Sequence, residues 1–310
     1  MFPRLDILIP VYNEESYIEE TLQSLCSCVL PDKLNVRLIF SDNASEDNSL
    51  KIIMACNLPF KTLVFSQETN IGGRGNWEFL MQQVEGDFFM FLDAHDLISP
   101  NYFIEFQYGL LNESENPLAF IGAEIALNES QDSFYLYPKE WQYYFSNNPK
   151  LRIWQLIFEL RPNTIVHSIF KTSDFFFADL VLSKSYTFDH LITHIGLMKR
   201  NVRINSSANY IRRYRKVVGN DFSHEVAPGK FETRVQRVLG NTQKEFDDKF
   251  LASDIFYAVK SSIPYGTKIL AFCILKLKYS GGRKSKIIFK IFRKSFRTIN
   301  AWRSQREVKG

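Results

Sequence analysis

Two acidic clusters early in the chain combine side chains that could bind a nucleotide and a metal ion. One surrounds Asp42, and the other is the run Asp93-Ala94-His95-Asp96. Each directly follows a short apolar run, at 36–40 and at 88–92, which is typical of a buried strand in a parallel sheet. Because ligands of open α/β sheets bind beyond the carboxyl ends of the strands, the clusters predict a site for a nucleoside diphosphate.

The elements that must position these clusters are alternating strands and helices. Apolar runs of strand length lie at 5–10, 36–40, 63–65, 87–92 and 118–121. Segments with apolar residues at helical spacing lie between the runs, with Asn13 and Ser45 expected to cap the first two helices and Met54 to pack inward. Repeated β-α-β units predict an α/β fold with a doubly wound, mostly parallel sheet.

Composition is that of a globular protein. The chain has 310 residues, 45% of them hydrophobic, and its 28 Phe and 14 Tyr supply a large core. This argues against disorder and suits one α/β domain with an appendage. No stretch approaches the roughly 20 apolar residues of a membrane span, and no secretory signal is recognised, so the expected compartment is the cytoplasm. The four cysteines fit no zinc pattern and are expected to be reduced thiols.

Charge is distributed unevenly along the chain. The net charge is +4, but residues 251–310 hold 14 Lys and Arg against two acidic residues. Between 286 and 302, basic residues fall on one face of a predicted helix and apolar residues on the other. Such a helix can bind an anionic membrane surface, or it can pack on the body of the protein with its basic face in solvent. No nucleic acid is expected as a partner, because no recognisable binding fold accompanies the basic residues.

Four motifs resemble, in order, those of family 2 glycosyltransferases, which are enzymes of the GT-A fold that transfer sugars from nucleotide donors. Ile-Leu-Ile-Pro-Val-Tyr-Asn-Glu at 7–14 resembles the opening strand and turn. Ser-Asp-Asn-Ala-Ser-Glu-Asp at 41–47 resembles the second-strand motif, and Asn-Ile-Gly-Gly-Arg-Gly-Asn at 70–76 the segment before the metal motif. Phe-Leu-Asp-Ala-His-Asp at 91–96 resembles the Asp-x-Asp region.

The resemblance implies a divalent cation at the last of these motifs. Asp93 and His95 occupy the positions of the family's metal-binding pair, with His95 in place of the second Asp. Oxygen ligands suit Mn²⁺ or Mg²⁺, and the imidazole favours Mn²⁺. Asp96 is a competing ligand. Alternatively, Asp96 caps the following loop or helix, and His95 is held by hydrogen bonds alone.

The same resemblance implies a nucleoside pocket at the ends of the first two strands. Asp42 would accept a hydrogen bond from uracil N3–H or a ribose hydroxyl, and Pro10, Tyr12 and Glu14 would frame the pocket. The alternative for Asp42 is a turn-forming residue. Arg74 either contacts the nucleotide or is a solvated residue at the start of a helix.

The catalytic base is expected later in the chain. Inverting transfer needs a base for the acceptor hydroxyl, and the resemblance places it at Asp189, although Phe188 stands where the family usually has an acidic residue. A helix N-cap is the alternative for Asp189. The basic run 210–216 either contacts a diphosphate or anionic acceptor or forms a solvated loop, and His224 is a further candidate metal ligand.

Together these features predict an inverting, metal-assisted glycosyltransferase with a GT-A-like fold. Its donor would be a nucleotide sugar, UDP-linked for preference, and its acceptor a saccharide or lipid-linked molecule in cell-surface polysaccharide synthesis. We expect a nucleotide-sugar-binding half at 1–125, an acceptor-binding half at 126–235 and a basic helical tail at 236–310. A non-catalytic glycan- or membrane-binding protein on a degenerate scaffold is the alternative, since two of the family's acidic residues are missing.

Overall fold

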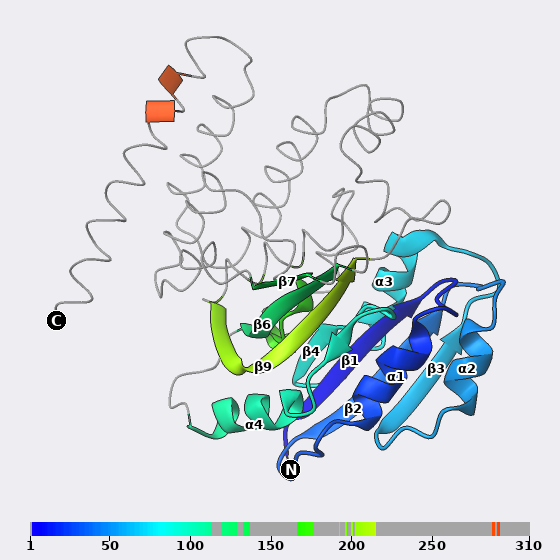
Figure 1. Cartoon of the computed structure of the whole chain (residues 1–310), viewed down its shortest axis with the longest axis horizontal. Coiled ribbons are helices and arrows are strands. Elements are labelled where there is room, and N and C mark those ends of the chain that lie inside the picture. Colours follow the sequence, from blue (N-terminus) through cyan, green and yellow to red (C-terminus); the bar gives the residue numbers. More distant parts are fainter. Residues whose placement is uncertain are drawn as a thin grey trace.

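The structure is a computed structural model that describes residues 2–112, 119–128, 133–136, 166–175 and 202–214, with the single positions 192, 196, 200, 287, 288, 290 and 291. Structural statements concern these residues, which are the coloured parts of Figure 1. Within them, no helix combines the length and the apolar character needed to cross a membrane.

A five-stranded sheet with the order β3-β2-β1-β4-β8 forms the centre of the described structure (Figure 1). Its strands are β1 (Arg4–Val11), β2 (Asn35–Asp42), β3 (Lys61–Ser66), β4 (Phe88–Phe91) and β8 (Phe170–Lys171). β1 pairs in parallel with β2 and β4, β2 pairs in parallel with β3, and β8 pairs antiparallel with β4. The predicted α/β fold with a mostly parallel sheet is confirmed.

Helices cover both faces of this sheet. They are α1 (Ile18–Cys26), α2 (Ser49–Ala55), α3 (Gly72–Gln82) and α4 (Tyr102–Asn112). The main core joins one side of β1, including Ile7 and Ile9, to buried residues of α1, α2 and α4. α3 contacts β1 and β2 from the other side, where Trp77 stacks on Phe91 with ring centroids 3.9 Å apart. Burial on both faces explains why the strand sequences are almost continuously apolar.

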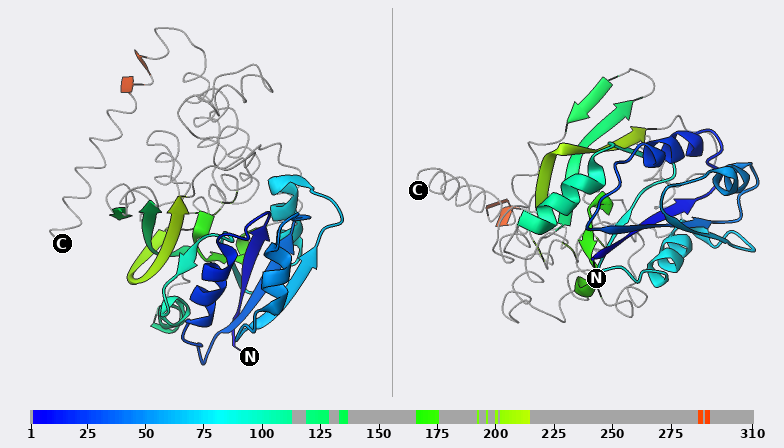
Figure 2. Two further views of the ribbon diagram at one scale, coloured as in Figure 1. Left: turned by 45° about the vertical axis from the view of Figure 1, so that its right-hand side comes forward. Right: turned by 90° about the horizontal axis from the view of Figure 1, so that it is seen from below.

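A second, four-stranded sheet lies beside β4 and α4 (Figures 1 and 2). In its order, the strands are β5 (Leu97–Ile98), β9 (Val202–Tyr214), β6 (Ala119–Asn128) and β7 (Ser133–Leu136). β9 runs parallel to β6 and antiparallel to β5. Of these four strands, the sequence predicted only the start of β6. The solvated loop considered for 210–216 is wrong for residues 210–214, because these residues form the end of β9. The division expected at 125/126 falls inside β6 and remains a prediction.

Two local predictions are wrong. α1 begins at Ile18 and α2 at Ser49, so neither Asn13 nor Ser45 caps a helix. Instead, the Asn13 backbone has a φ of 53°, and its N–H donates to Ser45 Oγ at 3.0 Å. Met54 is 67% exposed rather than packed inward, because the short α2 presents Ser49 and Ile53 to the core.

The thiols in the described part of the chain are free, as predicted. They belong to Cys26, Cys28 and Cys56. Burial, with a smaller contribution from Cys26, raises the pKa of Cys28 to about 12, so this thiol is protonated and unreactive at neutral pH.

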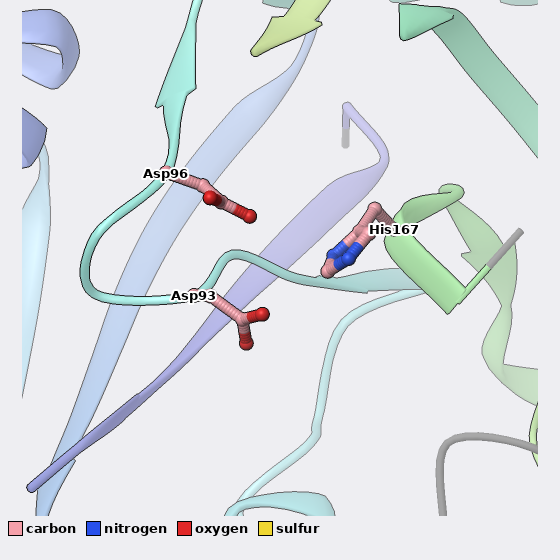
Figure 3. Close-up of side chains that lie close together, drawn as sticks. All are labelled: Asp93, Asp96 and His167. Atoms are coloured by element: carbon pink, nitrogen blue, oxygen red, sulfur yellow. The ribbon is translucent and has the colours of Figure 1, made fainter. Parts of the chain in front are cut away.

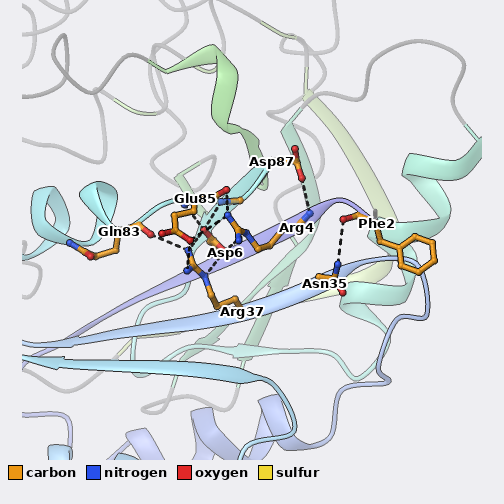
Figure 4. A network of polar contacts seen from close by, with 9 residues as sticks. Phe2, Arg4, Asp6, Asn35, Arg37, Gln83, Glu85 and Asp87 are labelled. Carbon is orange, nitrogen blue, oxygen red and sulfur yellow. Dashed lines mark hydrogen bonds and ion pairs between the residues drawn. The ribbon is translucent and has the colours of Figure 1, made fainter.

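The amino-terminal edge of the first sheet holds a buried ion pair (Figure 4). Asp6, with no exposed surface, accepts hydrogen bonds from Arg37 Nε at 2.9 Å and from Arg37 Nη2 at 2.7 Å. Its Oδ2 also accepts the backbone N–H groups of Glu85 at 2.8 Å and Gly86 at 2.7 Å. Burial opposes the charge on Arg37, but the hydrogen bonds and negative charges of Asp6 and Glu85 raise its pKa above the ordinary value. One carboxylate therefore joins β1, β2 and the turn that leads into β4.

Gly86 is required by this arrangement. A Cβ at this position would lie 2.7 Å from the Phe88 carbonyl oxygen, 2.8 Å from the Arg4 carbonyl oxygen and 3.0 Å from the Asp6 carboxyl carbon. Backbone atoms cannot move aside as a flexible side chain can, so a larger residue would push the turn away from Asp6.

Replacing Asp6 by Asn should lower the free energy of unfolding by about 3–5 kcal/mol, because Arg37 would lose its buried counter-ion and keep only the exposed carboxylate of Glu85. Urea denaturation followed by circular dichroism measures this. Glu85→Gln is the matched control: its side chain contacts the same Arg37 but is 66% exposed. We expect that change to cost less than about 1 kcal/mol. Equal losses in the two variants would contradict the importance of the buried contact.

Candidate active site

The loops that follow β1, β2 and β4 lie at one edge of the parallel sheet. Val11, the last residue of β1, is opposite Asp42, the last residue of β2, and Leu8 is opposite Phe91 of β4. Ligands of open α/β sheets bind at this carboxyl edge. Both acidic clusters found in the sequence therefore lie where a ligand would bind.

Reciprocal hydrogen bonds join the loops after β1 and β2. The Asn13 N–H donates to Ser45 Oγ, and the Glu46 N–H donates back to Asn13 Oδ1 at 2.9 Å. The Glu14 N–H donates to the buried Ser49 Oγ at 2.7 Å. These bonds cross-link the two loops and hold the end of β1 against the end of β2.

Three residues expected to frame a nucleoside pocket lie at the end of β1. Pro10 is partly buried opposite Ser41. Tyr12 is 42% exposed and so is accessible to a ligand. Glu14 is 6% exposed and lies against the loop after β4, with its Oε1 3.2 Å from His95 Nδ1. Tyr12 and Glu14 thus lie in different surroundings.

Asp42 is almost fully buried at the end of β2. Its side chain is 2% exposed, and its Oδ2 accepts the Ser45 N–H at 3.2 Å, as a turn-forming carboxylate does. Its Oδ1 is buried and has no hydrogen-bond partner among the described residues. A buried carboxylate oxygen without a donor is costly, so Oδ1 is a suitable acceptor for a ligand N–H or hydroxyl.

An amide network connects the end of β2 to the start of α3. Asn76 Nδ2 donates to the Ser41 carbonyl oxygen at 3.0 Å, and Ser41 Oγ donates to Asn76 Oδ1 at 2.6 Å. Arg74, in the first turn of α3, is partly buried, and its Nε donates to Glu78 Oε1 at 2.7 Å. The network holds the first turns of α3 against the end of β2, so Arg74 lies at the carboxyl edge of the sheet.

The loop after β4 contributes to a group of three metal-ligating side chains (Figure 3). Asp93, Asp96 and His167 each offer one ligand atom, and these atoms lie within 4.8 Å of one another. Asp96 has no exposed surface, and His167 is 3% exposed. Sequence reasoning considered Asp93 and Asp96 but missed His167. The available signal was a histidine next to Val166 and shortly before Ile169 and Phe170, in a segment for which the sequence predicted no site.

His95 lies next to this group and contacts Glu14. Its Nδ1 is 3.2 Å from Glu14 Oε1, and its Nε2 is 3.9 Å from Asp96 Oδ1. Burial lowers the pKa of His95, but the hydrogen bond to Glu14 and the negative charges of the neighbouring carboxylates outweigh burial and raise it. The raised pKa reflects the three carboxylates of Glu14, Asp93 and Asp96 that lie around this imidazole.

The other predicted site residues lie outside the described part of the chain. These are Asp189, His224 and nearly all of the basic tail. Their roles remain predictions from the sequence.

Comparison with known proteins identifies the family. The model of glycosyl transferase family 2 matches residues 6–169. The chain belongs to this family, as the sequence motifs predicted. The poly(ribitol-phosphate) β-N-acetylglucosaminyltransferase TarS of Staphylococcus aureus is 33% identical over 97 residues, which are 31% of this chain and 17% of TarS. The match therefore spans much less than two thirds of that relative.

Solved structures share the fold. S. aureus TarS 1–349 in complex with UDP-GlcNAc has a TM-score of 0.54 at 19% identity, over 89% of this chain and 80% of that chain. GalNAc-T7 with UDP, GalNAc and Mn²⁺ has a TM-score of 0.50 at 16% identity, over 90% of this chain and 55% of that chain. The predicted GT-A-like fold is confirmed.

The cross-linked loops make a prediction about two serines. Ser49→Ala should lower the free energy of unfolding by about 1–3 kcal/mol, because the buried Glu14 N–H loses its acceptor. Ser45→Ala is the control, since its bond to Asn13 is exposed and water can replace it. Urea denaturation of both variants measures the difference, and a loss for Ser45→Ala as large as that for Ser49→Ala would contradict it.

Proposed function

We propose that this chain is an inverting glycosyltransferase that moves a sugar from a UDP-linked donor to a saccharide or lipid-linked acceptor in cell-surface polysaccharide synthesis. The observation that carries the proposal is the grouping of Asp93, Asp96 and His167 at the carboxyl edge that also holds Asp42. Family membership supports transfer from a nucleotide sugar, and the UDP-GlcNAc bound to TarS 1–349 supports UDP as the nucleotide.

The three grouped side chains fit a divalent cation. Two carboxylates and an imidazole suit Mn²⁺, with Mg²⁺ as the second candidate because it prefers oxygen ligands. Such a cation supplies positive charge that eases departure of a nucleoside diphosphate. GalNAc-T7, which was solved with UDP and Mn²⁺, supports this assignment. Asp93 belongs to this group and to the Asp93–His95 pair expected from the sequence.

Asp42 would hold the nucleoside. Its buried Oδ1 would accept uracil N3–H or a ribose hydroxyl, and its Oδ2 would keep the bond to the Ser45 N–H. Pro10 and Tyr12 would line the same pocket, with the exposed Tyr12 ring available to a base. Arg74 would meet the nucleotide from the start of α3. Glu14 would act through His95, since it contacts that imidazole.

Asp189 would be the base that deprotonates the acceptor hydroxyl. This role rests on the resemblance of the sequence around Asp189 to the family. The acceptor class is supported by TarS, whose name gives poly(ribitol-phosphate), a polymer, as its substrate. Association of the basic tail with the inner face of a membrane remains a prediction, as does a cytoplasmic location.

A non-catalytic binding protein is the second candidate function. It is favoured by one observation: His95 replaces the family's second Asp, and its Nδ1 is engaged by Glu14. Such a protein would bind a nucleotide sugar or glycan without turning it over.

The nucleotide site can be tested by calorimetric titration of UDP and GDP, each with and without Mn²⁺. We expect UDP to bind with Mn²⁺ and binding to weaken about tenfold or more in Asp93→Ala. Asp42→Asn should weaken UDP both with and without the metal, because it changes the nucleoside contact. Absence of nucleotide binding under every condition would contradict the site. Slow Mn²⁺-dependent UDP release from UDP-GlcNAc, abolished in Asp93→Ala, would separate the enzyme from the binding protein.

The identity of the metal ligands can be tested with two histidine variants. The grouping predicts that His167→Gln weakens Mn²⁺ about tenfold or more, whereas His95→Gln weakens it less. The electron paramagnetic resonance signal of free Mn²⁺ gives both affinities. The opposite order would favour Asp93 and His95 as the metal-binding pair.

A further inference from the structure

Tyr210 of β9 lies against the loop that carries Asp93 and Asp96. In the second sheet, Tyr210 is paired with Ile98 of β5, which directly follows that loop. Its side chain is 1% exposed. The β5–β9 pairing therefore brings a tyrosine from late in the chain into the centre of the candidate site.

The side chain of Tyr210 contacts each member of the group formed by Asp93, Asp96 and His167. Its hydroxyl donates to Asp96 Oδ2 at 2.8 Å and accepts the backbone N–H of Asp93 at 3.4 Å. Its ring stacks on the His167 imidazole, with centroids 4.4 Å apart and an angle of 22° between the planes. Packing alone requires no such polar contacts to both aspartates.

The hydroxyl of Tyr210 is suited to act as a fixed hydrogen-bond donor to Asp96. The hydroxyl is buried together with its hydrogen bond to Asp96 Oδ2, and a tyrosine phenol is ordinarily neutral at neutral pH. A neutral donor can hold one oxygen of Asp96 in place without competing for a cation as a positively charged side chain would. Partners of this kind orient metal ligands, and their loss typically weakens metal binding about 10–100-fold.

We propose that Tyr210 is a positioning residue that holds Asp93, Asp96 and His167 in the geometry that binds the divalent cation. The second sheet would thus control the metal affinity of a loop that belongs to the first sheet. This inference rests on the proposed function, because it requires that the group binds a cation.

Tyr210→Phe tests the role of the hydroxyl, since the variant keeps the ring that stacks on His167. We expect Mn²⁺ affinity, measured by electron paramagnetic resonance, to fall about tenfold or more. Tyr102→Phe is the control: Tyr102 has no exposed surface, and it lies in α4 rather than in β9. That variant should bind Mn²⁺ as the wild type does. If Tyr210→Phe lowers the free energy of unfolding but leaves Mn²⁺ affinity unchanged, Tyr210 is only structural and the proposal is wrong.

A double-mutant cycle tests whether Tyr210 acts through Asp96. In an Asp96→Asn background, Tyr210→Phe should have a much smaller effect on Mn²⁺ affinity than in the wild type. If the two substitutions lower Mn²⁺ affinity by independent factors, Tyr210 does not act through Asp96 and the coupling is wrong. Should Tyr210→Phe fail to fold, 3-fluorotyrosine at position 210 offers a second measurement. Its ¹⁹F resonance should shift during a Mg²⁺ titration in step with binding, and an unchanged resonance would overturn the proposal.

The Mn²⁺ affinities of the variants distinguish a failure of the metal site from a failure of the role of Tyr210. If wild-type protein binds no Mn²⁺, the metal site of the proposed function fails. If the wild type binds Mn²⁺ and Asp93→Ala does not, but Tyr210→Phe binds as tightly as the wild type, only the role of Tyr210 fails.

Discussion

The buried carboxylate of Asp6 is the constraint on which the first sheet depends. A charge without exposure is tolerated only when donors surround it, and Asp6 receives two bonds from Arg37 and two from backbone N–H groups at Glu85 and Gly86. Because these donors belong to β2 and to the turn before β4, Asp6 holds the three central strands at their amino ends. The carboxyl ends of the same strands are then left for side chains that bind ligands.

The amino and carboxyl edges of the first sheet differ in the charged side chains that they bring together. At the amino edge, the buried charge of Asp6 is balanced by Arg37 at 2.7 Å, with Arg4 at 3.8 Å. At the carboxyl edge, Glu14, Asp93 and Asp96 lie around His95, and although burial lowers the pKa of this histidine, the hydrogen bond to Glu14 and the three negative charges raise it. A grouping of carboxylates of this kind would attract a divalent cation.

The second sheet completes the candidate site from outside the first. β5 directly follows the loop that carries Asp93 and Asp96, and its pairing with β9 places Tyr210 in contact with Asp96. β8 pairs with β4, and the segment before it supplies His167. Three separate segments of the chain, which carry Asp93 and Asp96, His167, and Tyr210, therefore meet at the candidate site. A change in β9 can therefore alter the positions of Asp93 and Asp96 through their contacts with Tyr210.

The sequence by itself determined the alternation of strands and helices, the family, and the placement of Asp42 and Asp93 at strand ends. These features are encoded locally, in apolar runs and in motifs of neighbouring residues. Only the tertiary structure decided that His167 and Tyr210 join Asp96, which precedes Tyr210 by 114 residues. It also decided that Asn13 and Ser45 bond each other instead of capping helices. The reason is physical: such contacts depend on which strands become neighbours, and strand order is a property of the whole packed chain that no local pattern contains.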